Sequence, residues 1–467
     1  MRRLNPSIFE IYALSLPRGL GFGRRPPVSF WASNDQLACG VVRRDVDDGS
    51  FGILSMRRRM DHVWCVTADN HGFFSADEAT LKLQILLCDE SRREPIPVGV
   101  RAHQFLYDVE KREPGSLFKL LAERTHRAAA WTLNQAYLAL PRPDRNWVSD
   151  FQTKNFHTRM WEAMLIASFR EQGVLVTQPV ESPDFRLENR YGDAAWVEAV
   201  TANPSESYDH VNAQVSATPQ VPEELFFGNA AVRFAKTLGN KIARRYEQMP
   251  HVRGCPFAIA IADFQSGGSM IWSRQSLVGY LYGIGAREVK PDGTRSATPI
   301  KASELLGASH FPAGLFTDAR NPELSAVIFS NACTLGKFNR IAISRGCDTR
   351  GLRYTRIGEF FDRTPGATQG IPFCMDVSSR EYGTLWEYGH EPWSAELEVF
   401  HNPFAQYPMS RKLLGEATHW FEKDGDLVCE SFHAPAILRS RTIIQDKSTP
   451  TIRLEDVLRH LDNDVNN

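Results

Sequence analysis

Three acidic residues stand inside or at the head of apolar segments between Phe156 and Val200. The stretch begins with FHTRMWEAMLIASFREQG, continues through VLVTQPVESPDFRLENRYGD and ends with AAWVEAV, and the three acids are Glu162, Asp184 and Glu198. A carboxylate seldom lies on a buried face unless it is paired or binds a cation, because an isolated buried charge is costly. This stretch therefore limits the fold more than any other, and it predicts a cation site.

The first of these acids is expected on a helix. Residues 156–172 repeat apolar side chains at helical spacing, and Gly173 follows where a helix C-terminus favours a left-handed residue. Glu162 shares the helix face of Leu165 and Phe169, three and seven residues later, so we expect its carboxylate to point toward the core.

The other two acids are expected on neighbouring strands. VLVTQPV and FRLE are predicted as short strands, and the turn from Asn189 to Asp193 folds the second of them back into AAWVEAV as a hairpin. After a loop, LFFGNAAVRFAKTLGNKIARRYEQM is predicted to be helical, and CPFAIAIADF is typical of a strand covered on both faces. The predicted order is helix, strand, strand, strand, helix, strand.

The rest of the chain is long enough for further domains, since 467 residues exceed the size at which one core keeps growing. Short strand-like runs followed by helical spacing predict an N-terminal β-rich domain that ends in helices over residues 1–145. The core takes residues 150–270, and residues 271–467 form a C-terminal α+β extension of unknown role. The expected class is α/β, or α+β over the whole chain.

Several local elements are predicted outside the core. ADEATLKLQILLCDES has Leu81, Ile85 and Cys88 at helical spacing, and PGSLFKLLAERTHRAAAWTLNQAYLAL is predicted as a longer helix. In the extension, IWSRQSLVGYLYGIG and KLLGEATHWFE are predicted as helices, whereas ELSAVIFSNACTL and FNRIAIS are predicted as strands.

Composition excludes some classes of function. A net charge of −1 gives no global preference for nucleic acid, so any such binding must come from local patches. The eight cysteines contain no CxxC pair, which argues against a zinc ribbon, and His157, His210 and His251 lack metal-ligand spacing. We find no signal-peptide pattern and no run as long as a membrane span, so a cytosolic protein without membrane contact is expected.

The order of elements, with an acid in the first helix, Pro183 and Asp184 heading the second strand and Glu198 inside the third, resembles the PD-(D/E)XK nuclease superfamily. The resemblance covers about residues 154–265. It implies a restriction-endonuclease-like αβββαβ core and metal-dependent hydrolysis of nucleic acid, with DNA expected before RNA, and a role in phage defence. Asp184 and Glu198 would hold Mg²⁺, or Mn²⁺, and Glu162 would contribute through a water or a second ion.

One position departs from the family pattern. Val200 stands two residues after Glu198, where the family has a lysine that orients the attacking water. In one interpretation the following helix supplies the amine, with Lys241 first and Lys236 second. In another, Gln178 or Thr201 orients the water. In a third, the site is degenerate and the fold serves as a binding module.

The sequence therefore predicts an endonuclease whose catalytic residues are Glu162, Asp184, Glu198 and Lys241, the three acids being the metal ligands. Two alternatives stay open: a non-catalytic nucleic-acid-binding or scaffold protein on the same fold, and an effector that a partner must activate. The expected partner is nucleic acid, and a second copy of the chain or another protein is left open.

Overall fold

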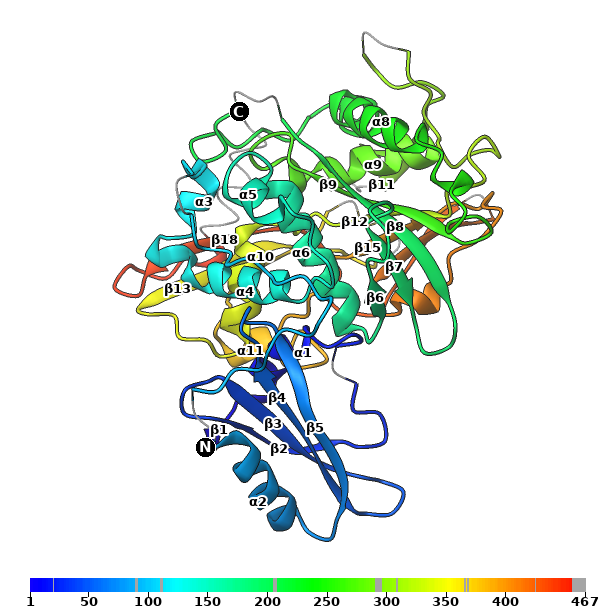
Figure 1. The fold of residues 1–467 in the computed structure, drawn as a ribbon. Coiled ribbons are helices and arrows are strands. Elements are labelled where there is room, and N and C mark those ends of the chain that lie inside the picture. Colours follow the sequence, from blue (N-terminus) through cyan, green and yellow to red (C-terminus); the bar gives the residue numbers. More distant parts are fainter. Residues whose placement is uncertain are drawn as a thin grey trace.

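The computed structural model describes residues 1–455 except 20, 89–90, 110–111, 205–207, 290–295, 308–309, 365–366, 368 and 425. An eight-stranded sheet in the order β17-β16-β15-β12-β9-β8-β7-β6 crosses the larger part of the molecule (Figure 1). Strands β8, β9 and β12 are parallel to one another, as are β15 and β16, and the other neighbours are antiparallel. The bounds are β6 Leu175–Thr177, β7 Phe185–Glu188, β8 Ala194–Ala202, β9 Phe257–Asp263, β12 Ala326–Phe329, β15 Glu398–His401, β16 Thr418–Lys423 and β17 Asp426–Ser431.

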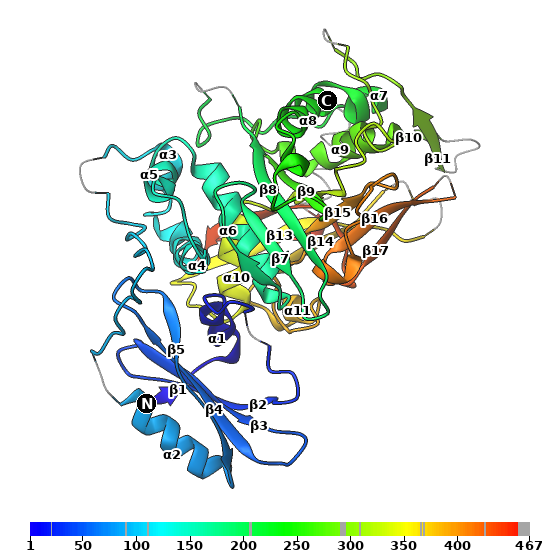
Figure 2. The ribbon, with the colours of Figure 1, turned by 45° about the vertical axis from the view of Figure 1, so that its right-hand side comes forward.

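Helices cover both faces of this sheet. Apolar residues of α4, α6 and α10 share one buried cluster with the sheet, and those of α8 and α9 share another. In Figures 1 and 2, helices α4, α6 and α10 lie together, apart from α8 and α9. The helices are α3 Ser116–Leu120, α4 Arg127–Leu138, α5 Trp147–Gln152, α6 Phe156–Glu171, α7 Pro222–Phe227, α8 Asn229–Ile242, α9 Ser273–Tyr282, α10 Leu335–Ser344 and α11 Arg380–Gly383, with 3-10 turns at Arg124–His126, Tyr246–Gln248, Ser269–Ile271 and Arg411–Leu414.

An antiparallel five-stranded sheet forms the N-terminal end of the molecule, shown in blue in Figure 2. Helix α1 packs on one face and α2 on the other. The helix predicted from the spacing of Leu81 and Ile85 is present as α2, which buries Ala79, Leu83 and Leu87, whereas Leu81 and Ile85 are exposed. The elements are β1 Arg2–Arg3, α1 Pro6–Ala13, β2 Pro27–Ala32, β3 Ala38–Arg44, β4 Phe51–Arg58, β5 Trp64–Phe73 and α2 Ala76–Leu87.

Two smaller sheets complete the chain. Strand β13 lies between β14 and β18 in an antiparallel three-stranded sheet, and β10 pairs with β11 as a hairpin. Their bounds are β10 Ile284–Val289, β11 Ser296–Lys301, β13 Leu352–Phe360, β14 Ile371–Asp376 and β18 Ile437–Asp446.

The mixed α and β class predicted from the sequence is confirmed. The order helix, strand, strand, strand, helix, strand is present as α6, β6, β7, β8, α8 and β9, with the short α7 before α8. Two predictions in the extension were wrong: FNRIAIS lies in helix α10, and KLLGEATHWFE forms a 3-10 turn followed by strand β16. Four strands beyond residue 270 continue the large sheet across the predicted boundary.

Candidate functional site

Strands β7 and β8 bring two of the predicted acids together. Phe185 pairs with Val197 in the antiparallel ladder, which sets Asp184, just before β7, beside Glu198 in β8. The link is direct, because Asp184 Oδ2 accepts a hydrogen bond of 2.7 Å from the amide of Ala199. Glu198 is 4% exposed. A buried carboxylate thus lies next to a second, half-buried one.

Side-chain alternation points Glu198 toward α8. Its neighbours Val197 and Ala199 pack in the cluster with α6, while Trp196 packs in the cluster with α8. Successive residues of a strand face opposite sides of a sheet, so Glu198 belongs to the α8 side. Lys241, near the end of α8, reaches it there.

The amine missing at Val200 has a counterpart in Lys241. Lys241 Nζ donates to Glu198 Oε1 at 2.6 Å, and the hydroxyl of Tyr246 donates to the same oxygen at 2.8 Å. From the residues that the structure describes, the other oxygen, Oε2, accepts only a long bond of 3.4 Å from the Ser182 hydroxyl. Glu198 therefore has one oxygen held by two strong donors and one that is weakly held.

The other proposed substitutes for the lysine make contacts elsewhere. The Lys236 ammonium lies 5.7 Å from the centre of the Phe311 ring. Gln178 accepts from the amide of Arg142, and the Thr201 hydroxyl bonds the Thr158 hydroxyl of α6 at 2.8 Å. Of the residues that the sequence offered, Lys241 is the one that contacts Glu198.

Electrostatics set Asp184 apart. Burial raises the pKa of its carboxyl well above the ordinary value, and the nearby charges of Glu198 and Glu162 raise it further, against the amide of Ala199 and the charge of Lys241. Burial and the same Glu198 charge raise the pKa of the Tyr246 hydroxyl, which keeps that group a hydrogen-bond donor. One lysine does not balance the acids at this site.

Glu162 lies within electrostatic reach of Asp184, but other side chains bind its oxygens. Trp147 Nε1 donates to Oε2 at 2.7 Å, and Arg159, one helical turn earlier on α6, donates to Oε1 at 2.9 Å. Arg159 also pairs with Asp150 at 2.6 Å and with Asp144 at 2.7 Å. Glu162 is thus part of an ion-pair network on the α6 side.

The predicted triad of metal ligands is not assembled. Across the described residues, no group of three or more His, Cys, Asp or Glu side chains is placed to hold a metal ion. The physical reason is that Arg159 and Trp147 satisfy Glu162. Asp184 and Glu198 remain as a pair, and a pair fits Mg²⁺, which is bound by one or two carboxylates together with waters and phosphate oxygens.

Each acid of this pair has an oxygen free for a cation. Within the described chain, Asp184 Oδ1 accepts no hydrogen bond, and Glu198 Oε2 has only the long contact with Ser182. The residues present therefore fit a divalent cation held by two carboxylates.

The sequence alone did not single out Arg159, Trp147 or Tyr246. Arg159 carried a usable signal, since side chains three residues apart on a helix are neighbours and it stands three before Glu162. Trp147 and Tyr246 reach the acids from other elements, α5 and the turn after α8, so no local pattern marks them.

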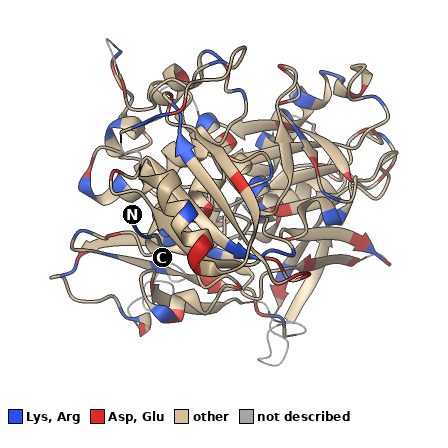
Figure 3. Ribbon diagram, turned by 60° about the horizontal axis from the view of Figure 1, so that its bottom comes forward, with Lys and Arg blue, Asp and Glu red and all other residues tan. Residues whose placement is uncertain are grey.

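Basic side chains lie near Lys241. Arg244, Arg245 and Arg253 are exposed, and the Arg244 charge acts on Tyr246. Figure 3 shows basic and acidic residues interspersed in its view of the molecule. Phosphate contacts at this site would therefore depend on these few residues and not on a broad basic face.

Comparison with known protein families, with curated proteins and with solved structures gives no match. None of the helices in the described ranges has the length and apolar character that crossing a bilayer requires.

Proposed function

We propose that the chain is a metal-dependent nuclease of the PD-(D/E)XK type that hydrolyses phosphodiester bonds in nucleic acid, with DNA preferred to RNA. The observation that carries the proposal is the contact of Lys241 on α8 with Glu198 on β8, beside Asp184. This contact supplies the amine that the family pattern has at the position of Val200 and that this chain lacks there. A restriction-endonuclease-like core and a role in phage defence belong to the same proposal and rest on the family resemblance.

Asp184 and Glu198 would hold Mg²⁺, or Mn²⁺, through Asp184 Oδ1 and Glu198 Oε2. The cation would lower the pKa of water and neutralise charge that develops on the phosphate. Lys241 would donate a hydrogen bond to the attacking water and orient it, and Tyr246 would keep Glu198 in place through Oε1. Arg244, which lies close to Tyr246, would contact the phosphate backbone of the substrate.

A second candidate, a nucleic-acid-binding protein without catalysis, is favoured by one observation. Glu162 is bound by Arg159 and Trp147, so both oxygens of the helix acid of the family pattern already have donors. Arg159 also pairs with Asp144 and Asp150. A partner protein that broke the bond between Arg159 and Glu162 and left Arg159 on these two acids would free the Glu162 carboxylate. Activation by a partner could act in this way.

The test is cleavage of plasmid DNA, single-stranded DNA and RNA in Mg²⁺ or Mn²⁺. Asp184→Ala and Glu198→Ala should lower the rate by about a thousandfold or more, because each removes a cation ligand. Lys241→Ala should lower it by about a hundredfold, the usual contribution of a positioned proton-handling group. Lys236→Ala, on the same helix, is the matched control and should cleave as wild type does.

Two results would decide against the proposal. Equal cleavage by wild type and both acid variants would mean that another site or a contaminant acts. Nucleic-acid binding without cleavage by any form, in either metal, would favour the non-catalytic candidate.

A further inference from the structure

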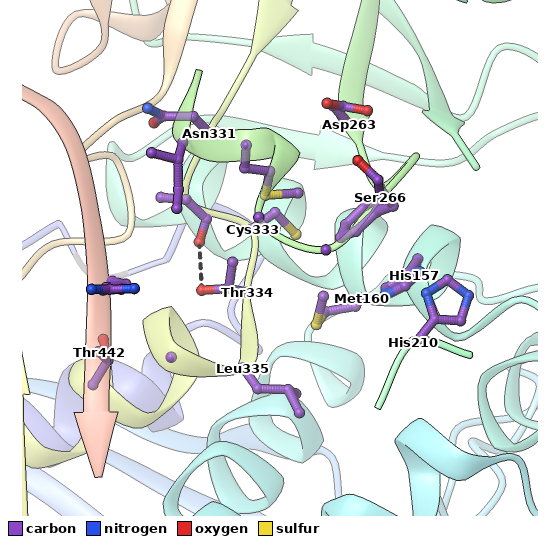
Figure 4. Close-up of a pocket in the computed structure, with 18 of the residues that line it drawn as sticks. His157, Met160, His210, Asp263, Ser266, Asn331, Cys333, Thr334, Leu335 and Thr442 are labelled. Carbon is purple, nitrogen blue, oxygen red and sulfur yellow. Dashed lines mark hydrogen bonds between the residues drawn. The ribbon is translucent and has the colours of Figure 1, made fainter. Parts of the chain in front are cut away.

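A cavity of about 330 Å³ opens on the α6 side of the sheet, at the carboxyl ends of β9 and β12 (Figure 4). Its walls come from the first turns of α6 and α10, the segments after β9 and β12, and strand β18. The described residues that line this cavity do not include Glu162, Asp184, Glu198 or Lys241 of the candidate nuclease site. Cavities at the carboxyl ends of parallel strands are common ligand sites, and this volume suits a small molecule.

One wall is aromatic. The ring of His157 stacks on Phe264 with centres 4.1 Å apart and planes at 10°, and His210 meets His157 edge-on at 4.4 Å. Tyr208 stands 5.0 Å from His210. Burial lowers the pKa of His157 to about 3, so its ring is uncharged near neutral pH. Uncharged aromatic rings of this kind can stack with any nucleobase, because every base has a flat π-face.

Two buried acceptor groups border the cavity. Asp263, at the end of β9, is 1% exposed, and it has donors within the protein: the amide of Gln265 bonds its Oδ1, and the hydroxyls of Ser269 and Ser273 also act on its carboxyl. Asn331 Oδ1 has no hydrogen-bond partner in the part of the chain that the structure describes, although the amide of Asn331 donates to the carbonyl of Leu438. Buried polar atoms are nearly always paired, so this amide oxygen, left free at a cavity, points to a donor on a ligand.

Donors for an anion come from α10 and β18. Thr334 caps α10 by accepting from the amide of Lys337, which leaves the amides of Leu335 and Gly336 with no acceptor among the described residues. Arg441, on β18, is exposed and lines the cavity, and its guanidinium likewise has no ion pair or hydrogen bond within the described chain. In Figure 4, Thr334 lies between Thr442 on one side and His157 and His210 on the other. A helix N-terminus with a nearby arginine suits a phosphate.

Gly336 favours this arrangement. A Cβ at this position would stand 3.0 Å from the Thr442 hydroxyl, a tight contact that Thr442 would have to shift to relieve, so glycine suits the close approach of the first turn of α10 to β18. The unpaired amides and Arg441 are thereby held on the same wall of the cavity.

We propose that the cavity binds a nucleoside monophosphate. The base stacks against the wall of His157 and His210, and a hydroxyl or amino group of the nucleoside donates to Asn331 Oδ1. The phosphate accepts from the amides of α10 and from Arg441. The proposal does not rest on the nuclease function, because it uses different residues on the other side of the sheet.

Calorimetric titration of the full chain with AMP, GMP, CMP and UMP tests the proposal, with the matching nucleosides and inorganic phosphate in parallel. We expect one molecule of at least one nucleotide to bind per chain, with its nucleoside and phosphate each about tenfold weaker or worse, since both ends contribute. Absence of binding for all four nucleotides at millimolar concentration would overturn the proposal. Phosphate that binds as tightly as the nucleotides would also overturn it, because the base would then contribute nothing.

Variants locate the site. Arg441→Ala should weaken the nucleotide about tenfold and leave its nucleoside unchanged, whereas His210→Ala should weaken both about tenfold. Arg380→Ala removes an exposed arginine outside the cavity and should bind as wild type does. Asp184→Ala should also bind as wild type does. If Asp184→Ala abolishes binding, or if neither Arg441→Ala nor His210→Ala weakens it, the nucleotide binds elsewhere and the proposal fails.

Discussion

Two groups of buried carboxylates in this protein differ in how their charge is balanced. Glu391 is fully buried, and Arg340 binds it through Nε at 2.9 Å and a second nitrogen at 3.0 Å, with Lys337 at 3.0 Å and Arg356 at 3.6 Å. Burial raises its pKa, but the three cations outweigh burial, and the pKa lies well below the ordinary value. At Asp184 and Glu198, Lys241 is the one cation that contacts either carboxylate among the described residues, and the pKa of Asp184 lies well above its ordinary value.

The difference separates structural charge from functional charge. A buried carboxylate that is fully paired joins elements of the fold, here α10, β13 and the segment that contains Glu391. A buried carboxylate without enough positive charge around it lowers the stability of the fold. Such carboxylates are found mainly at functional sites, where a bound cation, a ligand or the reaction supplies the positive charge. On this reasoning the cation that we propose fits the Asp184 and Glu198 pair and not the Glu391 cluster.

The largest effect is expected at the balanced cluster. Glu391→Gln should lower the free energy of unfolding by about 3–5 kcal/mol, because it leaves Lys337, Arg340 and Arg356 buried without their counter-charge. Chemical denaturation measures the loss. Glu387→Gln, at an exposed position four residues earlier, is the control and should change stability by no more than about 0.5 kcal/mol. Equal stabilities of the two variants would show that Glu391 does not balance the cluster.

Divalent cation should stabilise the unbalanced pair. With Mg²⁺ at a hundred times its Kd, the free energy of unfolding should rise by about 2.7 kcal/mol relative to the protein in EDTA. Asp184→Asn should abolish the rise, and Glu162→Gln should keep it, because Arg159 and Trp147 already bind Glu162. If Glu162→Gln also abolished the rise, Glu162 would be a ligand after all.

These two groups also show what the sequence could predict. Asp184 and Glu198 stand on a strand pair that the sequence predicted as a hairpin, and the family resemblance suggested that they act together. Lys241, on the following helix, was one of three interpretations for the missing lysine, chosen because its helical spacing sets it beside the face toward the sheet. The Glu391 cluster joins residues more than fifty positions apart, such as Lys337 and Glu391, and no periodicity connects them. Glu162 lies between these cases: its inward direction was predicted, but its partner Trp147 on α5 was not.

Errors in the fold have a similar origin. FNRIAIS is a short run with β-branched residues, and such runs do not distinguish strand from buried helix. Its tertiary contacts decide in favour of the helix, because α10 packs closely on α4, where Asn339 accepts from the amide of Ala129 and Phe338 accepts from Thr132. Helix α2 was predicted from the helical spacing of Leu81 and Ile85, but the narrower face of Ala79 and Leu83 fits against the sheet.

A smaller effect is expected at Glu171, which resembles Asp184 in having one cation and a neighbouring acid. Burial raises the pKa of Glu171 to about 7, against the charge of Arg345, and Glu416 raises it further. The folded state then binds more protons than the unfolded state between about pH 4.5 and 7, so stability falls as pH rises through that window, by at most about 1.4 kcal/mol per pH unit.

Comparison of wild type with Glu171→Gln across pH 4.5 to 8 measures this slope. Glutamine does not ionise, so the stability of the variant should not fall as pH rises through this window. The one carbonyl oxygen of glutamine can accept from Arg345 or from the amide of Ser394 but not from both as Glu171 does, and that loss is the same at every pH. Parallel profiles for the two proteins would mean that Glu171 ionises in the folded state as it does in the unfolded chain.

The smallest effect is expected from neutralising the unbalanced acid without metal. Asp184→Asn keeps an oxygen that can accept from the amide of Ala199, and it removes a buried charge that Glu198 repels. In EDTA near neutral pH the variant should therefore be more stable than wild type, by about 1 kcal/mol, the usual size of a single substitution but with the opposite sign. Glu391→Gln carries the same change of charge and should destabilise. If both variants lost stability in EDTA, Asp184 would be a balanced structural group, and the contrast between the two sites would not hold.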